Sequence, residues 1–187
     1  MSFIESYNID KKICADLIKL FENAKDFQIE GKIGLGRVDH RYKKSMEVSF
    51  EPSSIYIKDY LTELTKCINK YKKKYDSLEL LTRWEITEPV KIQKYKPKDG
   101  YFATHVERDS LQPFCDRVLV FMTYLNTIKE EGGTYFPYQD YTGQPIQGNT
   151  LIWPADFTHP HKGIVAPKET KYIITGWYNF KNNENNS

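Results

Sequence analysis

Hydrophobic residues recur at helical spacing in the first part of the chain. One stripe comprises Ile13, Leu17, Ile18 and Phe21. Asp10 precedes this stripe and can cap it, so the pattern predicts a helix that ends near Lys25. A second apolar stripe predicts a helix over residues 54–75. Residues 27–53 have a weak period and several Gly, Pro and Ser residues, so we expect loops with one short strand there.

From residue 84 onward the hydrophobic period changes to two, which is the period of a β-strand. Residues 117–125 are apolar on both faces, which predicts a strand that is buried on both sides. Further strands are predicted at 90–94, 101–107, 134–136, 150–153, 161–165 and 171–180. Two helices followed by about seven or eight short strands predict an α+β, mainly β domain built on a barrel or jelly roll.

The chain shows neither an internal repeat nor a linker that would separate two domains, so we expect a single domain over residues 1–187. Within it, residues 1–80 would provide supporting helices and loops. Residues 84–180 would form the strand-rich core, and residues 182–187 a flexible polar tail.

Composition excludes several classes of protein. With 40% hydrophobic and 28% charged residues, the chain is typical of a globular protein and not of a disordered one. The net charge of +2 gives no strong signal for nucleic acid or an anionic membrane. The sequence has no apolar run of transmembrane length and no signal peptide, so we expect a cytoplasmic protein. The three cysteines are far apart and indicate neither a disulfide framework nor a zinc site.

The histidines of the strand-rich half suggest a metal site. His105 and Glu107 are two residues apart on a predicted strand, so their side chains leave the same face. A histidine from another strand would complete a set of two imidazoles and one carboxylate, which is typical of non-haem Fe(II) oxygenases. His161 and His159 both qualify, because residues two apart on a strand point to the same face. Asp109 is a rival carboxylate, but an extended strand would place it roughly 13 Å from His105.

Lys171 opens a strand whose same face bears Ile173, Thr175 and Trp177. An ammonium group among apolar side chains is costly unless an anion meets it, which suggests a site for an acidic ligand. The alternative is a lysine that extends along the strand end to reach water.

Several motifs occur together in a fixed order. They are His105-x-Glu107, Tyr124-Leu125-Asn126, Gly132-Gly133-Thr134-x-Phe136-Pro137, and His161-x-Gly163 with Lys171 ten residues after the histidine. In this arrangement the chain resembles the prolyl 4-hydroxylase-type branch of the 2-oxoglutarate- and Fe(II)-dependent dioxygenases, over roughly residues 80–180. The resemblance implies a double-stranded β-helix, a jelly roll or cupin-like barrel, with supporting N-terminal helices.

The resemblance also implies roles for individual residues. His105, Glu107 and His161 would hold the iron, and Lys171 would pair with the distal carboxylate of 2-oxoglutarate. Tyr95 and Tyr124 match positions at which related enzymes place hydroxyl groups near this cosubstrate. Tyr101, His159 and Trp177 are further candidates for contact with the substrate or with the metal ligands. The usual carboxylate ligand is Asp, so the longer Glu107 is a departure from the family pattern.

The activity implied is hydroxylation of an unactivated C–H bond, with release of succinate and CO2, and ascorbate would maintain Fe(II). A prolyl residue in a peptide or protein is the leading substrate. A free amino acid or other small molecule is the alternative, and a non-catalytic jelly-roll binding module is a second one. We expect loops 31–53, 108–116 and 138–149 to surround the site, because specificity usually resides in such loops.

Overall fold

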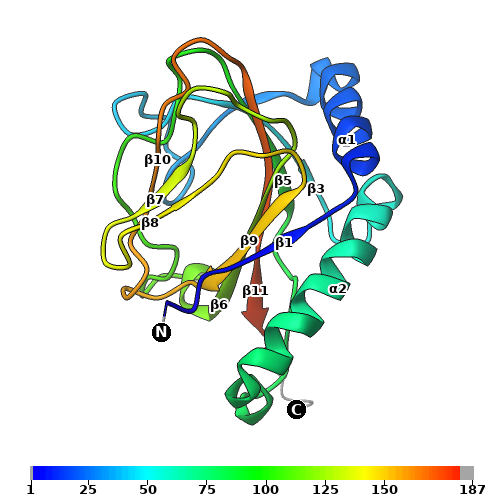
Figure 1. The fold of residues 1–187 in the computed structure, drawn as a ribbon, viewed down its shortest axis with the longest axis vertical. Helices are drawn as coiled ribbons and strands as arrows, with labels where there is room; N and C mark the ends of the chain where they lie inside the picture. Colours follow the sequence, from blue (N-terminus) through cyan, green and yellow to red (C-terminus); the bar gives the residue numbers. More distant parts are fainter. Residues whose placement is uncertain (1, 182–187) are drawn as a thin grey trace.

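The period-two segments form two antiparallel sheets in a computed structural model, which describes residues 2–181 (Figure 1). The larger sheet has eight strands: β1 (Glu5–Asn8), β2 (Ile29–Glu30), β3 (Met46–Phe50), β4 (Trp84–Glu85), β5 (Val90–Tyr95), β6 (Arg117–Tyr124), β9 (Asn149–Pro154) and β11 (Lys171–Phe180). The smaller sheet comprises β7 (Thr134–Phe136), β8 (Tyr141–Gly143) and β10 (Lys162–Gly163). This arrangement confirms the predicted jelly-roll class, which is mainly β with supporting helices.

The large sheet has the order β1-β9-β6-β11-β5-β3-β2, and β4 also pairs with β11. The last strand, β11, therefore lies between β5 and β6 and pairs with both. Gly176 allows this close packing, because a Cβ atom there would lie 2.5 Å from the Phe121 ring. As predicted, β6 is buried on both faces, with only Val118 partly exposed.

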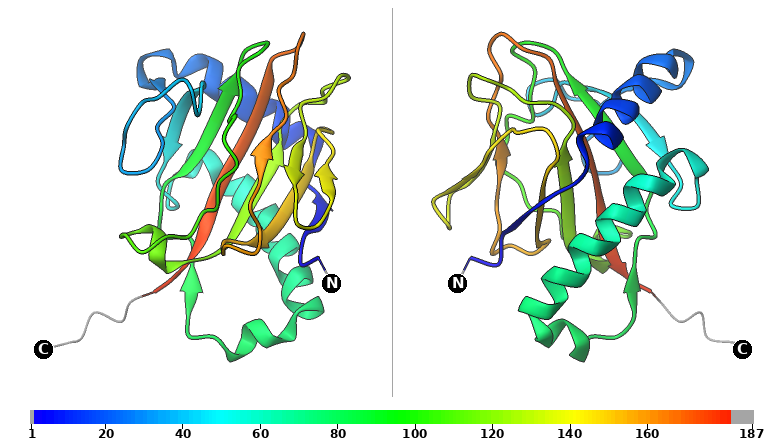
Figure 2. Two further views of the ribbon diagram at one scale, coloured as in Figure 1. Left: turned by 90° about the vertical axis from the view of Figure 1, so that its left-hand side faces the viewer. Right: turned by 45° about the vertical axis from the view of Figure 1, so that its right-hand side comes forward.

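Two helices cover the outer face of the large sheet (Figure 2). They are α1 (Lys11–Asn23) and α2 (Lys58–Lys74), so both helix predictions are confirmed. The Asp10 carboxylate accepts a hydrogen bond from the Lys12 backbone N–H at 2.7 Å, which caps α1. The helical stripes and the outward side chains of the sheet form one apolar core, which includes Phe21, Leu64 and Phe121. Each such fully buried side chain contributes roughly 1.5–3 kcal/mol.

The inner face of the large sheet is turned toward the small sheet (Figure 2). A second cluster of buried side chains lies here, and it is rich in aromatic rings: Tyr95, Tyr124, Phe136, Trp153 and Trp177. This inner layer holds the polar side chains described below.

Some local predictions are wrong. Residues 101–107 do not form a strand; they make only isolated bridges, between Lys43 and Tyr101 and between His105 and His161. The chain is diverted because Phe102 donates its backbone N–H to Tyr42 in a distant loop, whereas His105 pairs with His161. Strands β1, β2 and β8 carry too few residues to give a clear period.

The part of the chain before residue 80 provides β1, β2 and β3 as well as the two helices. The predicted tail, residues 182–187, lies outside the described residues. Within residues 2–181, no helix has both the length and the apolar character needed to span a bilayer.

Candidate functional site

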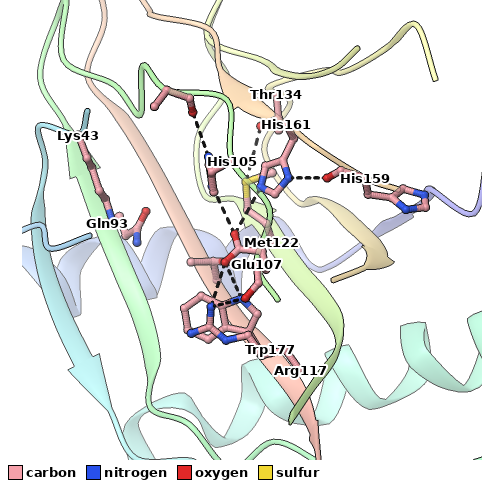
Figure 3. Close-up of polar contacts among 12 residues, drawn as sticks. Lys43, Gln93, His105, Glu107, Arg117, Met122, Thr134, His159, His161 and Trp177 are labelled. Atoms are coloured by element: carbon pink, nitrogen blue, oxygen red, sulfur yellow. Dashed lines mark hydrogen bonds and ion pairs between the residues drawn. The ribbon is translucent and has the colours of Figure 1, made fainter. Parts of the chain in front are cut away.

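Three side chains from two segments that are distant in sequence converge on the inner face of the large sheet: His105, Glu107 and His161 (Figure 3). One ligand atom from each lies within 4.8 Å of the other two. Backbone pairing fixes them, because the His105 N–H donates to the His161 carbonyl at 3.0 Å and the His161 N–H donates back at 2.9 Å. The Glu107 N–H donates to the Ala155 carbonyl at 3.2 Å, which fixes the third residue.

The two imidazole rings are oriented by backbone carbonyls. His105 Nδ1 lies 3.0 Å from the Ala103 carbonyl oxygen, and His161 Nδ1 lies 3.0 Å from that of His159. A carbonyl oxygen can only accept, so each Nδ1 is the protonated nitrogen. In a neutral ring the lone pair is then on Nε2, and both Nε2 atoms face Glu107 Oε1, at 3.4 and 3.3 Å.

Glu107 is held as a carboxylate. Burial would raise its pKa, but hydrogen bonds and charge from His105 and His161 hold the pKa well below its usual range. Its second oxygen, Oε2, accepts from Arg117 Nη1 at 3.1 Å and from Trp177 Nε1 at 3.0 Å (Figure 3). Oε1 is thereby left to face the imidazoles.

This donor set fits a metal ion. Burial, together with the charge of His105, lowers the pKa of His161, which favours a neutral ring with a free lone pair. With both rings neutral, their Nε2 atoms and Glu107 Oε1 are three acceptors that face one another, an arrangement that a cation stabilises. It is also the donor set typical of non-haem Fe(II) sites with open coordination positions.

Lys171 lies on the same inner face and is 4% exposed. Its ammonium donates to the backbone carbonyls of Gly132 at 3.0 Å and Ile164 at 3.2 Å. Two of its three N–H donors are used in this way, and among residues 2–181 no carboxylate forms an ion pair with it, so one donor is left for a ligand. Burial lowers the pKa of Lys171 to about 8.

Two tyrosines lie beside this lysine. The Lys171 ammonium is 5.2 Å from the centre of the Tyr95 ring, and the Tyr95 hydroxyl donates to Gln93 Oε1 at 2.7 Å. The Tyr124 hydroxyl donates to Thr134 Oγ1 at 2.8 Å, at the start of the strand that follows Gly132. Burial raises the pKa of both tyrosines above the usual range, so both hydroxyls stay protonated.

These groups surround one cavity of about 210 Å³. Its lining includes the His/Glu/His cluster and Lys171 with both tyrosines. Of the loops expected around the mouth, residues 32–34 and 43 of the first and residues 109 and 114 of the second line the cavity. No residue of 138–149 is among the lining residues that the structure describes.

Of the other candidate residues, His159 and Asp109 stay outside the ligand cluster, whereas Tyr101 contacts one of its rings. The His159 ring is buried, and its Nε2 contacts the Ser2 carbonyl oxygen at 2.8 Å, so only its backbone carbonyl reaches His161. Asp109 accepts from the Leu111 N–H at 2.8 Å and does not join the cluster. The Tyr101 ring stacks on His105 with ring centres 3.7 Å apart.

The sequence reasoning missed three polar residues of the cavity: Lys91, Gln93 and Arg117. Lys91 and Gln93 alternate with Val90 and Ile92 along β5, a pattern that also fits a strand with one face in water. Arg117 opens an apolar strand, and the rarity of buried unpaired arginine could have signalled a carboxylate partner.

The segment that carries this site is similar to a known protein family. Residues 90–179 match the family model described as the 2OG-Fe(II) oxygenase superfamily. This segment contains His105, Glu107, His161 and Lys171. No curated protein matches the chain.

Solved structures share the fold at low identity. The viral collagen prolyl hydroxylase from Paramecium Bursaria Chlorella virus-1, solved as a 2OG complex, has a TM-score of 0.72 and 17% identity, with 96% of each chain covered. A prolyl hydroxylase from Trichoplax adhaerens, in complex with a hypoxia inducible factor peptide fragment, has a TM-score of 0.74 and 16% identity, covering 96% of this chain and 84% of that one. A Pseudomonas putida prolyl-4-hydroxylase has a TM-score of 0.73 and 12% identity, covering 96% of this chain and 94% of that one. At these identities the likeness concerns the fold.

Proposed function

We propose that this chain, whose residues 90–179 match the model of the 2OG-Fe(II) oxygenase superfamily, uses Fe(II), 2-oxoglutarate and O2 to hydroxylate a prolyl residue in a peptide or protein. The observation that carries the proposal is the presence of His105, Glu107, His161 and Lys171 around one cavity. The first three would hold the metal, and the lysine would bind the far end of the cosubstrate.

When bound, Fe(II) supplies the activation of O2 that couples conversion of 2-oxoglutarate to succinate and CO2 with insertion of one oxygen atom into a substrate C–H bond. The protein holds the ligands ready for the ion. The Ala103 and His159 carbonyls fix the imidazole tautomers, and Arg117 and Trp177 hold the carboxylate. Such outer contacts orient metal ligands and increase their basicity.

Lys171 would orient the cosubstrate. A buried ammonium with one free donor forms a short charge-assisted hydrogen bond with a carboxylate. The Tyr95 and Tyr124 hydroxyls stay protonated and line the same part of the cavity. Each would donate to the cosubstrate by giving up its present hydrogen bond, to Gln93 or to Thr134. Aromatic side chains that surround this region exclude water, which strengthens each of these polar contacts.

The prolyl substrate is supported by the motif resemblance and by the fold shared with three prolyl hydroxylases. Residues of two loops line the cavity, and the apolar side chain of Val106, which is 37% exposed, lies among them. Such a rim can contact the residues that flank a target proline. A cytoplasmic location and a dependence on ascorbate stay predictions.

Anaerobic addition of Fe(II) and 2-oxoglutarate tests the chemistry. We expect the weak visible charge-transfer band of the chelate and, after O2 is admitted, release of succinate. Proline-containing peptides should increase the succinate released and gain the mass of one oxygen atom. The same peptides with alanine in place of proline are the matched control.

The outcomes separate the alternatives. Oxygen gain on free proline or another small molecule, with peptides unchanged, would replace the peptide substrate by a small one. Absence of both the band and succinate would favour a jelly-roll binding module without catalysis.

Binding of 2-oxoglutarate should weaken at alkaline pH. Burial lowers the pKa of Lys171 to about 8, so the ammonium in the free pocket is lost as the pH rises through that value. The dissociation constant for 2-oxoglutarate, measured anaerobically through the charge-transfer band, should be nearly constant below pH 7 and rise by up to about tenfold per pH unit above pH 8.

The Lys171→Arg variant is the control, because a guanidinium stays protonated throughout this range. Its dissociation constant should depend only weakly on pH. An equal alkaline rise in both proteins would assign the effect to another group.

A further inference from the structure

Arg117 is the most constrained charged side chain beside the metal-ligand cluster. Its guanidinium lies between two aromatic rings, 3.6 Å from the centre of Trp177 and 4.7 Å from that of Phe114. Glu88 accepts from its edge through both oxygens, from Nε at 2.7 Å and from Nη2 at 2.6 Å. Asn179 Nδ2 in turn donates to Glu88 at 2.8 Å. The position of Arg117 is therefore fixed independently of Glu107.

The remaining nitrogen of this guanidinium is directed at Glu107. Nη1 donates to the Glu107 backbone carbonyl at 3.0 Å and to its Oε2 at 3.1 Å (Figure 3). Trp177 Nε1 donates to the same Oε2 at 3.0 Å. The Arg117 guanidinium thus fixes the positions of both the main-chain carbonyl and the carboxylate of Glu107.

This geometry defines the side-chain length that position 107 needs. The carboxylate must reach Arg117 and Trp177 with Oε2 and both imidazoles with Oε1. Aspartate would withdraw the carboxylate by about 1.5 Å, the length of one C–C bond. The backbone cannot follow, because the Glu107 carbonyl is bound by Arg117 and its N–H by Ala155.

We propose that Arg117 and Trp177 are positioning residues that make glutamate, and not aspartate, the carboxylate that completes this metal site. The inference rests on the proposed function, since it concerns the same ion. It gives a structural reason for the one departure of this chain from the His-x-Asp motif.

The test measures metal binding and not turnover. Fe(II) affinity is determined anaerobically by competition with a chromophoric chelator, and Co(II) serves as a spectroscopic probe through its visible absorption bands. We expect Glu107→Asp to weaken Fe(II) binding at least about tenfold and to change the Co(II) spectrum. Trp177→Phe keeps the ring but removes the N–H donor, so we expect a smaller loss of roughly three- to tenfold.

Arg117 is removed together with its partner, as the Glu88→Gln/Arg117→Gln double variant, because a lone buried glutamate would destabilise the fold. We expect Fe(II) affinity to fall about 10- to 100-fold. The same double change in the Glu107→Asp background should add little, because both changes disrupt one interaction. If Arg117 acted only on the stability of the fold, the losses of Fe(II) affinity from the two sets of changes would instead add in full.

Matched controls come from the exposed Arg83, which pairs with Glu85 at 2.9 Å, and from Trp84. Arg83→Gln and Trp84→Phe should keep wild-type Fe(II) affinity, and thermal unfolding of the metal-free proteins reports stability separately. Wild-type affinity and an unchanged Co(II) spectrum in Glu107→Asp would overturn the inference. Failure of the wild-type protein itself to bind Fe(II) would instead refute the proposed function.

Discussion

The His161→Ala variant is expected to lose Fe(II) binding and 2-oxoglutarate oxidation, whereas His159→Ala should keep Fe(II) binding. His161 Nε2 is 3.3 Å from Glu107 Oε1 inside the ligand cluster, but the His159 ring contacts the Ser2 carbonyl outside it. Changes in the groups that orient a ligand already cost about 10- to 100-fold in affinity, so removal of a ligand should cost more than roughly 100-fold. The measurement is the anaerobic charge-transfer band with Fe(II) and 2-oxoglutarate.

Stability must be followed in the same proteins. The His159→Ala change keeps the backbone carbonyl that orients His161 but removes two contacts of a buried ring. We expect it to lower the free energy of unfolding by about 1–3 kcal/mol while the band persists. The opposite pattern, with the band lost in His159→Ala and retained in His161→Ala, would exchange the assignments of the two histidines.

The second large effect is expected at Lys171. Loss of one partner of a buried charge pair costs about 2–5 kcal/mol, so Lys171→Ala should raise the dissociation constant for 2-oxoglutarate by roughly 30- to 5,000-fold. Fe(II) affinity in the absence of 2-oxoglutarate should change little, because Lys171 does not belong to the ligand cluster. Anaerobic titrations of each ligand measure the two effects separately.

Lys162 provides a matched control, because it is exposed on β10 in the small sheet. Lys162→Ala should bind 2-oxoglutarate as the wild type does. If Lys171→Ala also did so, another group would have to anchor the distal carboxylate.

The sequence predicted those helices and strands whose own residues carry a clear hydrophobic pattern or a cap. Helix α1 has a cap at Asp10 and a clear stripe, and β6 and β11 are long runs rich in apolar, β-branched and aromatic residues. In contrast, β1 is four residues long and alternates between partly buried and exposed positions, so its strand conformation comes from pairing with β9. Such non-local pairing leaves almost no trace in a short segment.

In the candidate site, too, some residues could be predicted from local sequence motifs and others could not. Motif order indicated His105, Glu107, His161 and Lys171, and the structure brings all four to one cavity. Their roles as ligands and anchor stay predictions until metal and 2-oxoglutarate binding are measured. The support around Glu107 could not be predicted in this way, because Glu88 and Arg117 are 29 residues apart and meet only through the fold.

The central position of β11 has a consequence for folding during synthesis. The chain emerges from the ribosome in order, and domains usually fold as units. Strands β5 and β6 each pair with β11, so the two halves of the large sheet are joined by the strand that follows all its other described strands in sequence. Until residues 171–180 are released, the nascent polypeptide has an unfilled gap at the middle of its sheet, and chaperones would encounter it in that open state.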